Sequence, residues 1–145
     1  MPLLEPKRTK YRKAHRGRNR GKSIRGNRLA YGEFGVRALG NGRMTSRQIE
    51  AIRVLLRRRI GSLGKMWIRV FPALPITKKP LETRMGKGKG AVDSYEARVR
   101  RGRILFELAG VPRAIAVEAL SKVRYKMNIP TDVVTLRSEE GRPWR

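Results

Sequence analysis

The chain has no cysteine, a single histidine and few acidic residues. Without cysteine, neither a disulfide scaffold nor a zinc site with thiolate ligands can form. His15 stands among cations, so no serine–histidine–acid triad can be assembled around it. The closest acidic pair before the C-terminal tail is Asp93 and Glu96, which a strand would not point in the same direction. The sequence therefore predicts a protein that is not an enzyme and has no cofactor or metal of its own; any structural Mg²⁺ would be held by a bound RNA.

Long apolar runs are also missing. None approaches the ~18–20 residues that span a bilayer, and the N-terminus lacks the layout of a secretory signal, so we expect no membrane span. The length of 145 residues suits one domain. We predict a basic arm over residues 1–28, one RNA-binding domain over residues 29–137, and a polar tail over residues 138–145.

Positive charge is what the chain has in excess: 36 Lys and Arg against 11 Asp and Glu, a net charge of +25. Residues 7–28 hold eleven of these cations and no acid. Such a segment cannot bury enough apolar surface to offset its ordering entropy, so we expect it to be extended or disordered until a polyanion binds. RNA is the natural candidate, with Tyr11 stacking on bases or packing on sugars. The predicted contacts are Lys7, Arg8, Lys10, Tyr11, Arg12, Lys13, His15, Arg16, Arg18 and Arg20.

A second basic segment, residues 84–90, alternates glycine with lysine. Its open backbone N–H groups and its lysines suit a phosphate backbone, although a flexible, solvated loop would have the same composition. It lacks the spacing of a nucleoside-triphosphate loop. Its site residues are Arg84, Met85, Gly86, Lys87, Gly88, Lys89 and Gly90. A secondary basic face, which could instead be simply solvated, comprises Arg47, Arg57, Arg98, Arg100, Arg101 and Arg103.

Periodicity predicts an α+β fold in which two helices pack on one mostly antiparallel sheet. Thr45 and Gln48 fit a capping box that opens the first helix, which ends at Gly61; its apolar stripe is Ile49, Ile52, Leu56 and Ile60. The second helix starts at Pro112. Strands are expected within residues 29–39 and over 65–71, 95–99, 103–108 and 132–136, with 95–99 and 103–108 forming a hairpin. Prolines make residues 72–80 a rigid loop. Trp67, Phe71, Tyr31 and Phe34 could stack on bases, but their placement in strands favours core packing, which is the prediction for Trp67 and Phe71.

Several motifs, in order and at matching spacing, make residues 4–136 resemble bacterial-type large-subunit ribosomal protein number sixteen. They are LEPKRTKYRK (4–13), HRGR (15–18), GEFG (32–35), GRMTSRQIEA (42–51), GKMWIRVFP (64–72), PITKKP (75–80) and RMGKGKG (84–90). The resemblance implies an α/β-hammerhead-like domain that binds large-subunit rRNA and contacts neighbouring ribosomal proteins as a monomer. It also implies roles in positioning A-site tRNA and in late subunit assembly. The arm would insert into rRNA, and the loop 84–90 would point toward the peptidyl-transferase region.

The chain departs from the family pattern at Ala91, Asp93 and Tyr95, after the glycine loop, and at Met127-Asn128 near the end. It also has two additional residues at its start and a longer tail. These divergent ends make a mitochondrial ribosome, slightly favoured, and a bacterial one in the cytoplasm the two alternatives for its location.

Three other functions remain as alternatives. A DNA-compacting protein would use minor-groove wedges or long basic helices, whereas this chain offers an irregular arm. A nuclease would need an acid–base pair or a metal cluster. A membrane-active cationic protein needs an exposed amphipathic helix, and the helix around residues 49–60 is better explained as a core element.

Overall fold

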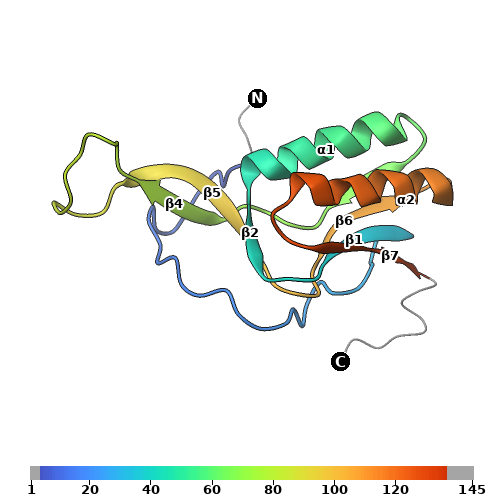
Figure 1. The fold of residues 1–145 in the computed structure, drawn as a ribbon, viewed down its shortest axis with the longest axis horizontal. Helices are drawn as coiled ribbons and strands as arrows, with labels where there is room; N and C mark the ends of the chain where they lie inside the picture. Colours follow the sequence, from blue (N-terminus) through green and yellow to red (C-terminus); the bar gives the residue numbers. More distant parts are fainter. Residues whose placement is uncertain (1–3, 137–145) are drawn as a thin grey trace.

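The strands of this protein form two antiparallel sheets, as a computed structural model describing residues 4–136 shows (Figure 1). One sheet has the order β3-β6-β1-β7 and the other β2-β5-β4. The α+β class and both main helices are confirmed, but the single sheet is wrong. The predicted polar tail, residues 138–145, lies outside the described residues. The elements are β1 (Phe34–Ala38), β2 (Gly42–Thr45), α1 (Ser46–Ile60), β3 (Lys65–Ile68), β4 (Leu74–Lys78), β5 (Ala91–Val99), β6 (Ile104–Ala109), α2 (Arg113–Ser121), a 3-10 helix (Lys122–Lys126) and β7 (Thr131–Thr135).

The predicted hairpin is the main error. A tight turn does follow β5, with Gly102 at φ +90°, but β5 and β6 enter different sheets. β6 is buried along nearly its whole length. It is a central strand of the four-stranded sheet, where it pairs with β1 along one edge and with β3 along the other. The turn signal shows that the chain reverses direction. It does not show which strand becomes the partner.

Helix α1 begins and ends where the sequence predicts. The Thr45 hydroxyl accepts a hydrogen bond from the Gln48 amide at 3.2 Å, and the Gln48 side chain accepts one from the Thr45 amide at 3.0 Å. Gly61 caps the C-terminus by donating to the Arg57 carbonyl. The predicted apolar stripe is buried, which confirms the capping box and the helix face.

The core lies between the helices and one face of the strands. α2 packs on β1 and β7 of the four-stranded sheet, and α1 packs on α2 and against β2 and β5 of the three-stranded sheet, so the two helices together join the sheets (Figure 1). Phe106 and Leu108 of β6 are fully buried, and each contributes about 1.5–3 kcal/mol of burial free energy. Phe71, in contrast, is 50% exposed, so its assignment to the core was wrong. Trp67 is only partly buried.

Two strands were missed. The segment predicted to be a proline-rich loop contains β4, in which Pro75 pairs with Tyr95. β4 is an edge strand, where the missing proline N–H leaves no inner ladder incomplete. The other is β2, a short strand leading directly into α1. No helix among residues 4–136 has the length and apolar character needed to cross a membrane.

Candidate RNA interface

The basic arm is attached to the domain through its backbone. Arg98 donates hydrogen bonds to the carbonyls of His15 (3.1 Å) and Arg16 (2.8 Å). Arg43 donates to the carbonyls of Arg16 (3.2 Å) and Gly17 (3.1 Å). Two arginines of the β2–β5 pair therefore hold a highly cationic segment by its neutral carbonyl groups. These contacts were not predicted from the sequence.

The arm and the loop 84–90 are tied together by two reciprocal contacts. The Lys13 ammonium donates to the carbonyl of Lys89 at 2.9 Å, and the Lys89 ammonium donates to the carbonyl of Ala14 at 2.7 Å. Two segments that are more than 70 residues apart in the chain, and that were predicted independently as RNA contacts, therefore lie side by side. Lys89 is consequently a structural contact as well as a candidate site residue.

Further along, the arm follows the ends of β2 and β5. The Asn19 amide donates to the carbonyls of Gly42 and Val99, both at 2.7 Å. The Ser23 amide then donates to the Arg101 carbonyl at 2.8 Å, and the Ile104 amide donates to the Gly26 carbonyl at 2.9 Å. Figure 1 shows this later part of the arm, in lighter blue, on the side of the strands away from the two helices.

The root of the arm, as we call residues 30–32 just after it, is fixed by Glu107. Glu107 is the one acid that is fully buried among residues 4–136. Its carboxylate accepts hydrogen bonds from three consecutive amides, those of Ala30, Tyr31 and Gly32, at 2.7–3.2 Å to Oε2. It also pairs with Arg69, whose guanidinium lies over the Tyr31 ring. A buried charge is tolerated only when it is paired and hydrogen-bonded, and Glu107 meets both conditions.

The side chains of the arm remain available. All ten residues predicted as arm contacts are exposed, including Tyr11 at 72%. The ion pairs among the described residues join Arg37 to Asp132, Arg53 to Glu50, Arg59 and Lys122 to Glu118, and Arg69 to Glu107. None of these pairs involves a residue of the arm or of the loop 84–90. The cations of the arm and of the loop therefore have no carboxylate partner within residues 4–136.

The paired acids on the helices are ordinary surface carboxylates. The side-chain hydrogen bond from Arg53 holds the pKa of Glu50 below its usual value. The hydrogen bond from Lys122, supported by the charges of Lys122 and Arg59, likewise lowers the pKa of Glu118. These pairs neutralise Arg53 and Arg59 of α1 and Lys122 of the 3-10 helix, whereas no cation of the arm or of the loop 84–90 has such a pair within residues 4–136.

The loop 84–90 joins β4 to β5 and projects from the end of the three-stranded sheet (Figure 1). Residues 81–89 are all exposed, and Met85 is 94% exposed. Lys87 has φ +53°, in the left-handed region that favours glycine. At the base, a Cβ on Gly90 would lie 2.6 Å from the Lys78 carbonyl oxygen, so only glycine fits there.

The secondary basic face is divided between two elements. Arg98, Arg100 and Arg103 line a cavity of about 540 Å³ together with Ser23, Ile24 and Arg25 of the arm. Arg101 lies in the same turn but does not line this cavity. Arg47 and Arg57 are exposed on α1 and are not part of it. The structure therefore brings four of the six predicted residues together and leaves two on the helix.

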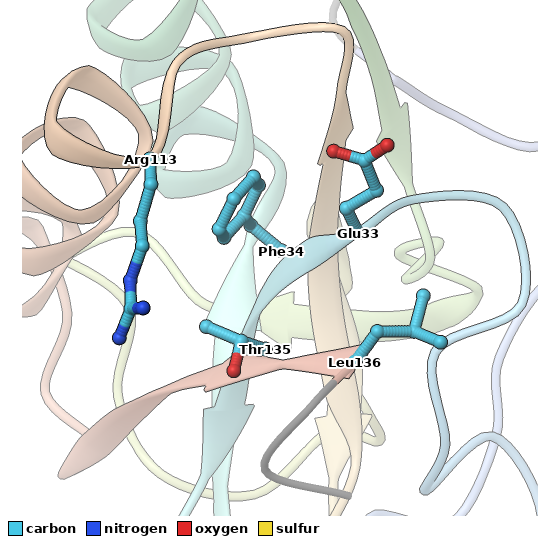
Figure 2. Close-up of a pocket in the computed structure, with 5 residues that line it drawn as sticks. All are labelled: Glu33, Phe34, Arg113, Thr135 and Leu136. Atoms are coloured by element: carbon cyan, nitrogen blue, oxygen red, sulfur yellow. The ribbon is translucent and has the colours of Figure 1, made fainter.

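A second cavity, of about 280 Å³, lies at the end of the four-stranded sheet beside the start of α2. Figure 2 shows the five residues that line it. Phe34 begins β1 and Glu33 precedes it, Arg113 begins α2, and Thr135 ends β7 and is followed by Leu136. One cation and one carboxylate flank an aromatic ring, so this cavity offers no net charge to attract a polyanion.

Four contributors to this interface were missed. Arg43, Asn19 and Glu107 act by holding the arm, and nothing in their sequence surroundings indicates that role. Arg25 belongs to the basic stretch 7–28, so charge density alone could have identified it. Among residues 4–136, no three His, Asp or Glu side chains gather into a group that could hold a metal ion.

Comparisons with known proteins match almost the whole described chain. The family model for ribosomal protein L16p/L10e matches residues 6–134. The large ribosomal subunit protein uL16 of Sulfurihydrogenibium sp. (strain YO3AOP1) is 54% identical over 134 residues, covering 92% of this chain and 97% of the relative. The protein of the same name from Sulfurovum sp. (strain NBC37-1) is 52% identical over 135 residues, covering 93% and 96%.

Proposed function

The chain belongs to the ribosomal protein L16p/L10e family, and from this premise we propose that its arm and its loop 84–90 together form one rRNA-binding surface. As a member of this family it is a structural component of the large ribosomal subunit and not an enzyme. Both relatives are bacterial, which supports the bacterial cytoplasm as the location of that ribosome.

One observation carries the proposal: the arm is held by its backbone carbonyls, while its cationic side chains stay exposed and form no ion pair with an acid of residues 4–136. A segment held in this way does not have to be ordered when RNA binds, so less of the phosphate-binding free energy is spent on conformational entropy. Arg and Lys side chains neutralise phosphates and release condensed counterions. The irregular path of the arm suits RNA shape better than the regular groove of a duplex.

The loop 84–90 would extend the same surface toward tRNA. Its exposure and its link to the arm through Lys13 and Lys89 support a shared role. We propose that it contacts the A-site tRNA near the peptidyl-transferase region. The arm would act during late assembly of the subunit, and neighbouring ribosomal proteins would be the other partners.

The test measures binding of the full chain to protein-free large-subunit rRNA at several salt concentrations. One variant removes three exposed arm cations (Arg8, Arg12 and Arg18, each to Gln), and its matched control removes three exposed cations elsewhere (Arg58, Arg124 and Lys126, each to Gln). Each lost phosphate contact should reduce the magnitude of the log–log salt slope by about 0.7–0.9. We expect a reduction of about two in the arm variant and a smaller one in the control.

Equal losses in the two variants would show that total charge, rather than the arm, determines binding. Equal affinity for duplex DNA of the same length would favour the DNA-compacting alternative. For the loop, Lys87→Ala should weaken A-site tRNA binding by reconstituted subunits without changing chain stability, with Lys126→Ala as the control. Unchanged tRNA binding would refute the role of the loop.

A further inference from the structure

The cavity between the arm and the turn after β5, called here the arm–turn cavity, is lined by Ser23, Ile24, Arg25, Arg98, Arg100 and Arg103. Half of this lining comes from the arm and half from the end of β5 and the turn that follows. Its volume of about 540 Å³ falls within the range of about 300–1,000 Å³ found for ligand pockets.

Four of the six lining residues are arginines and none is acidic. Arg98 and Arg103 donate to neutral carbonyls, those of His15 and Arg16 for the former and that of Arg69 for the latter. The side chains of Arg25 and Arg100 have no hydrogen bond or ion pair within residues 4–136. Four arginines that line one space with no counter-charge among residues 4–136 repel one another, and an anion in that space would remove the repulsion.

Two glycines of the arm lie directly against two of these guanidinium groups. A Cβ on Gly17 would lie 3.3 Å from Arg98 Nη2, and one on Gly26 would lie 3.4 Å from Arg103 Cζ. Both glycines have positive φ values, +56° and +68°, which other residues adopt only with strain. Arg98 and Arg103 therefore act as fixed walls, whereas Arg25 and Arg100 are free to move onto a ligand.

The cavity also has an apolar side. Ile24 is 89% exposed. It lies between two anchored points of the arm, the Ser23 amide bonded to Arg101 and the Gly26 carbonyl bonded to Ile104. An exposed isoleucine held beside four arginines offers apolar contact to a base or sugar next to a phosphate site.

We propose that the arm–turn cavity binds one nucleotide of an rRNA strand, with its phosphate held by Arg25 and Arg100 and its base or sugar against Ile24. This inference rests on the proposed rRNA-binding function and adds a defined subsite to it. Arginine forks match phosphate oxygens in geometry and charge. Because the arm supplies Ser23, Ile24 and Arg25, the subsite is complete only while the arm is docked.

The test uses the full chain, protein-free large-subunit rRNA and a photo-cross-linking residue, p-benzoylphenylalanine, in place of Ile24. Nucleotides that become cross-linked are mapped by stops in reverse transcription. Leu63, which is 63% exposed after α1, is the matched position for a control cross-linker. We expect the probe at position 24 to label one nucleotide or two adjacent ones, and the probe at position 63 to give no such focused label.

Charge variants then test the two free arginines. Arg25→Gln combined with Arg100→Gln should reduce the position-24 cross-link and the rRNA affinity by about 10-fold or more, since two charge-assisted contacts are lost. The matched control is Arg58→Gln combined with Arg124→Gln, which removes the same charge from exposed positions outside the cavity. It should lower the affinity by less than about threefold.

The outcomes separate the two levels of the proposal. Scattered cross-links from position 24, or equal losses in the two double variants, would overturn the subsite while leaving rRNA binding intact. Absence of any rRNA binding by the unmodified chain would overturn the proposed function itself. If inorganic phosphate at the concentration of the RNA abolishes the cross-link, the cavity takes a free anion rather than a nucleotide of a strand, and the inference is wrong.

Discussion

Replacing Glu107 with Gln should destabilise the protein far more than a change of one atom suggests. Glu107 is completely buried on the face of β6 that the root of the arm covers. Its Oε2 accepts hydrogen bonds from the amides of Tyr31 at 2.7 Å and Gly32 at 2.9 Å, with the Ala30 amide at 3.2 Å. Its other oxygen pairs with Arg69. Glutamine has the same shape, but it has one acceptor oxygen instead of two and no charge.

The expected loss of unfolding free energy comes from the three amides and the Arg69 guanidinium, which lose their charged acceptor. Hydrogen bonds to a charged group contribute about 1.5–3 kcal/mol each, and they are not additive when they share one acceptor. Breaking a buried ion pair by changing one partner costs about 3–5 kcal/mol. Arg69 keeps a side-chain exposure of 20%, so water recovers part of this loss. We therefore expect the free energy of unfolding to fall by about 3 kcal/mol and Tm to fall by about 10 °C.

Urea denaturation followed by circular dichroism gives the free energy of unfolding, and amide hydrogen exchange locates the change. Exchange should accelerate most at residues 30–32, where the three donors lose their charged acceptor. Glu33→Gln is the matched control, because Glu33 is nearby and exposed, and it should change stability by less than about 0.5 kcal/mol.

A loss below about 1 kcal/mol for Glu107→Gln, which is typical of an ordinary substitution, would refute the idea that this carboxylate anchors the arm. The same conclusion would follow if exchange at residues 30–32 stayed as slow as in the unmodified chain. A double-mutant cycle with Arg69→Met would then separate the ion pair from the amide contacts.

Three smaller effects should also be measurable. Thr45→Ala should cost about 1 kcal/mol of unfolding free energy in urea, because it removes the cap of α1. Gly64→Ala should cost about 1–3 kcal/mol, since the added Cβ would lie 2.3 Å from a methyl group of Val111; thermal unfolding tests this. Glu118→Gln should lower Tm at neutral pH, because the pKa of Glu118 is lowered in the folded state. The contribution of this carboxylate to stability is fully present above the ordinary pKa of 4.5. It disappears as pH falls through the lowered pKa.

Local signals in the sequence predicted local structure well. The capping box, the apolar stripe of α1 and the turn at Gly102 depend on neighbours within a few residues, and the structure contains all three. Pairing between strands depends on distant partners, and there the predictions failed. The turn after β5 was interpreted as a hairpin because the sequence of a tight turn is the same whether or not the strands on either side of it pair with each other. Pro75 argued against β4 because an edge position cannot be recognised from one strand alone.

The candidate interface shows the same division. Charge density selected the arm and the loop 84–90 as candidates, and the cationic side chains predicted as their contacts are exposed in the structure. It could not separate Arg98, which holds the arm, from Arg100, which has no partner within the described residues, because both are exposed arginines close together in sequence. That difference arises from the path of a segment some 80 residues away in the chain.

Docking of the arm brings the positive charges of Arg43 and Arg98 close to those of the arm. Each arginine that holds the arm brings another positive charge near a segment that is already cationic, and the repulsion opposes the hydrogen bonds that the carbonyls accept. RNA phosphates would relieve this repulsion. If RNA binds the docked arm and not the undocked arm, it stabilises docking by about 2.7 kcal/mol when its concentration is one hundred times Kd. Salt screens the same repulsion without supplying phosphates. Arm docking and RNA binding should therefore be coupled through Arg43 and Arg98, even though these two side chains bind the protein's own backbone.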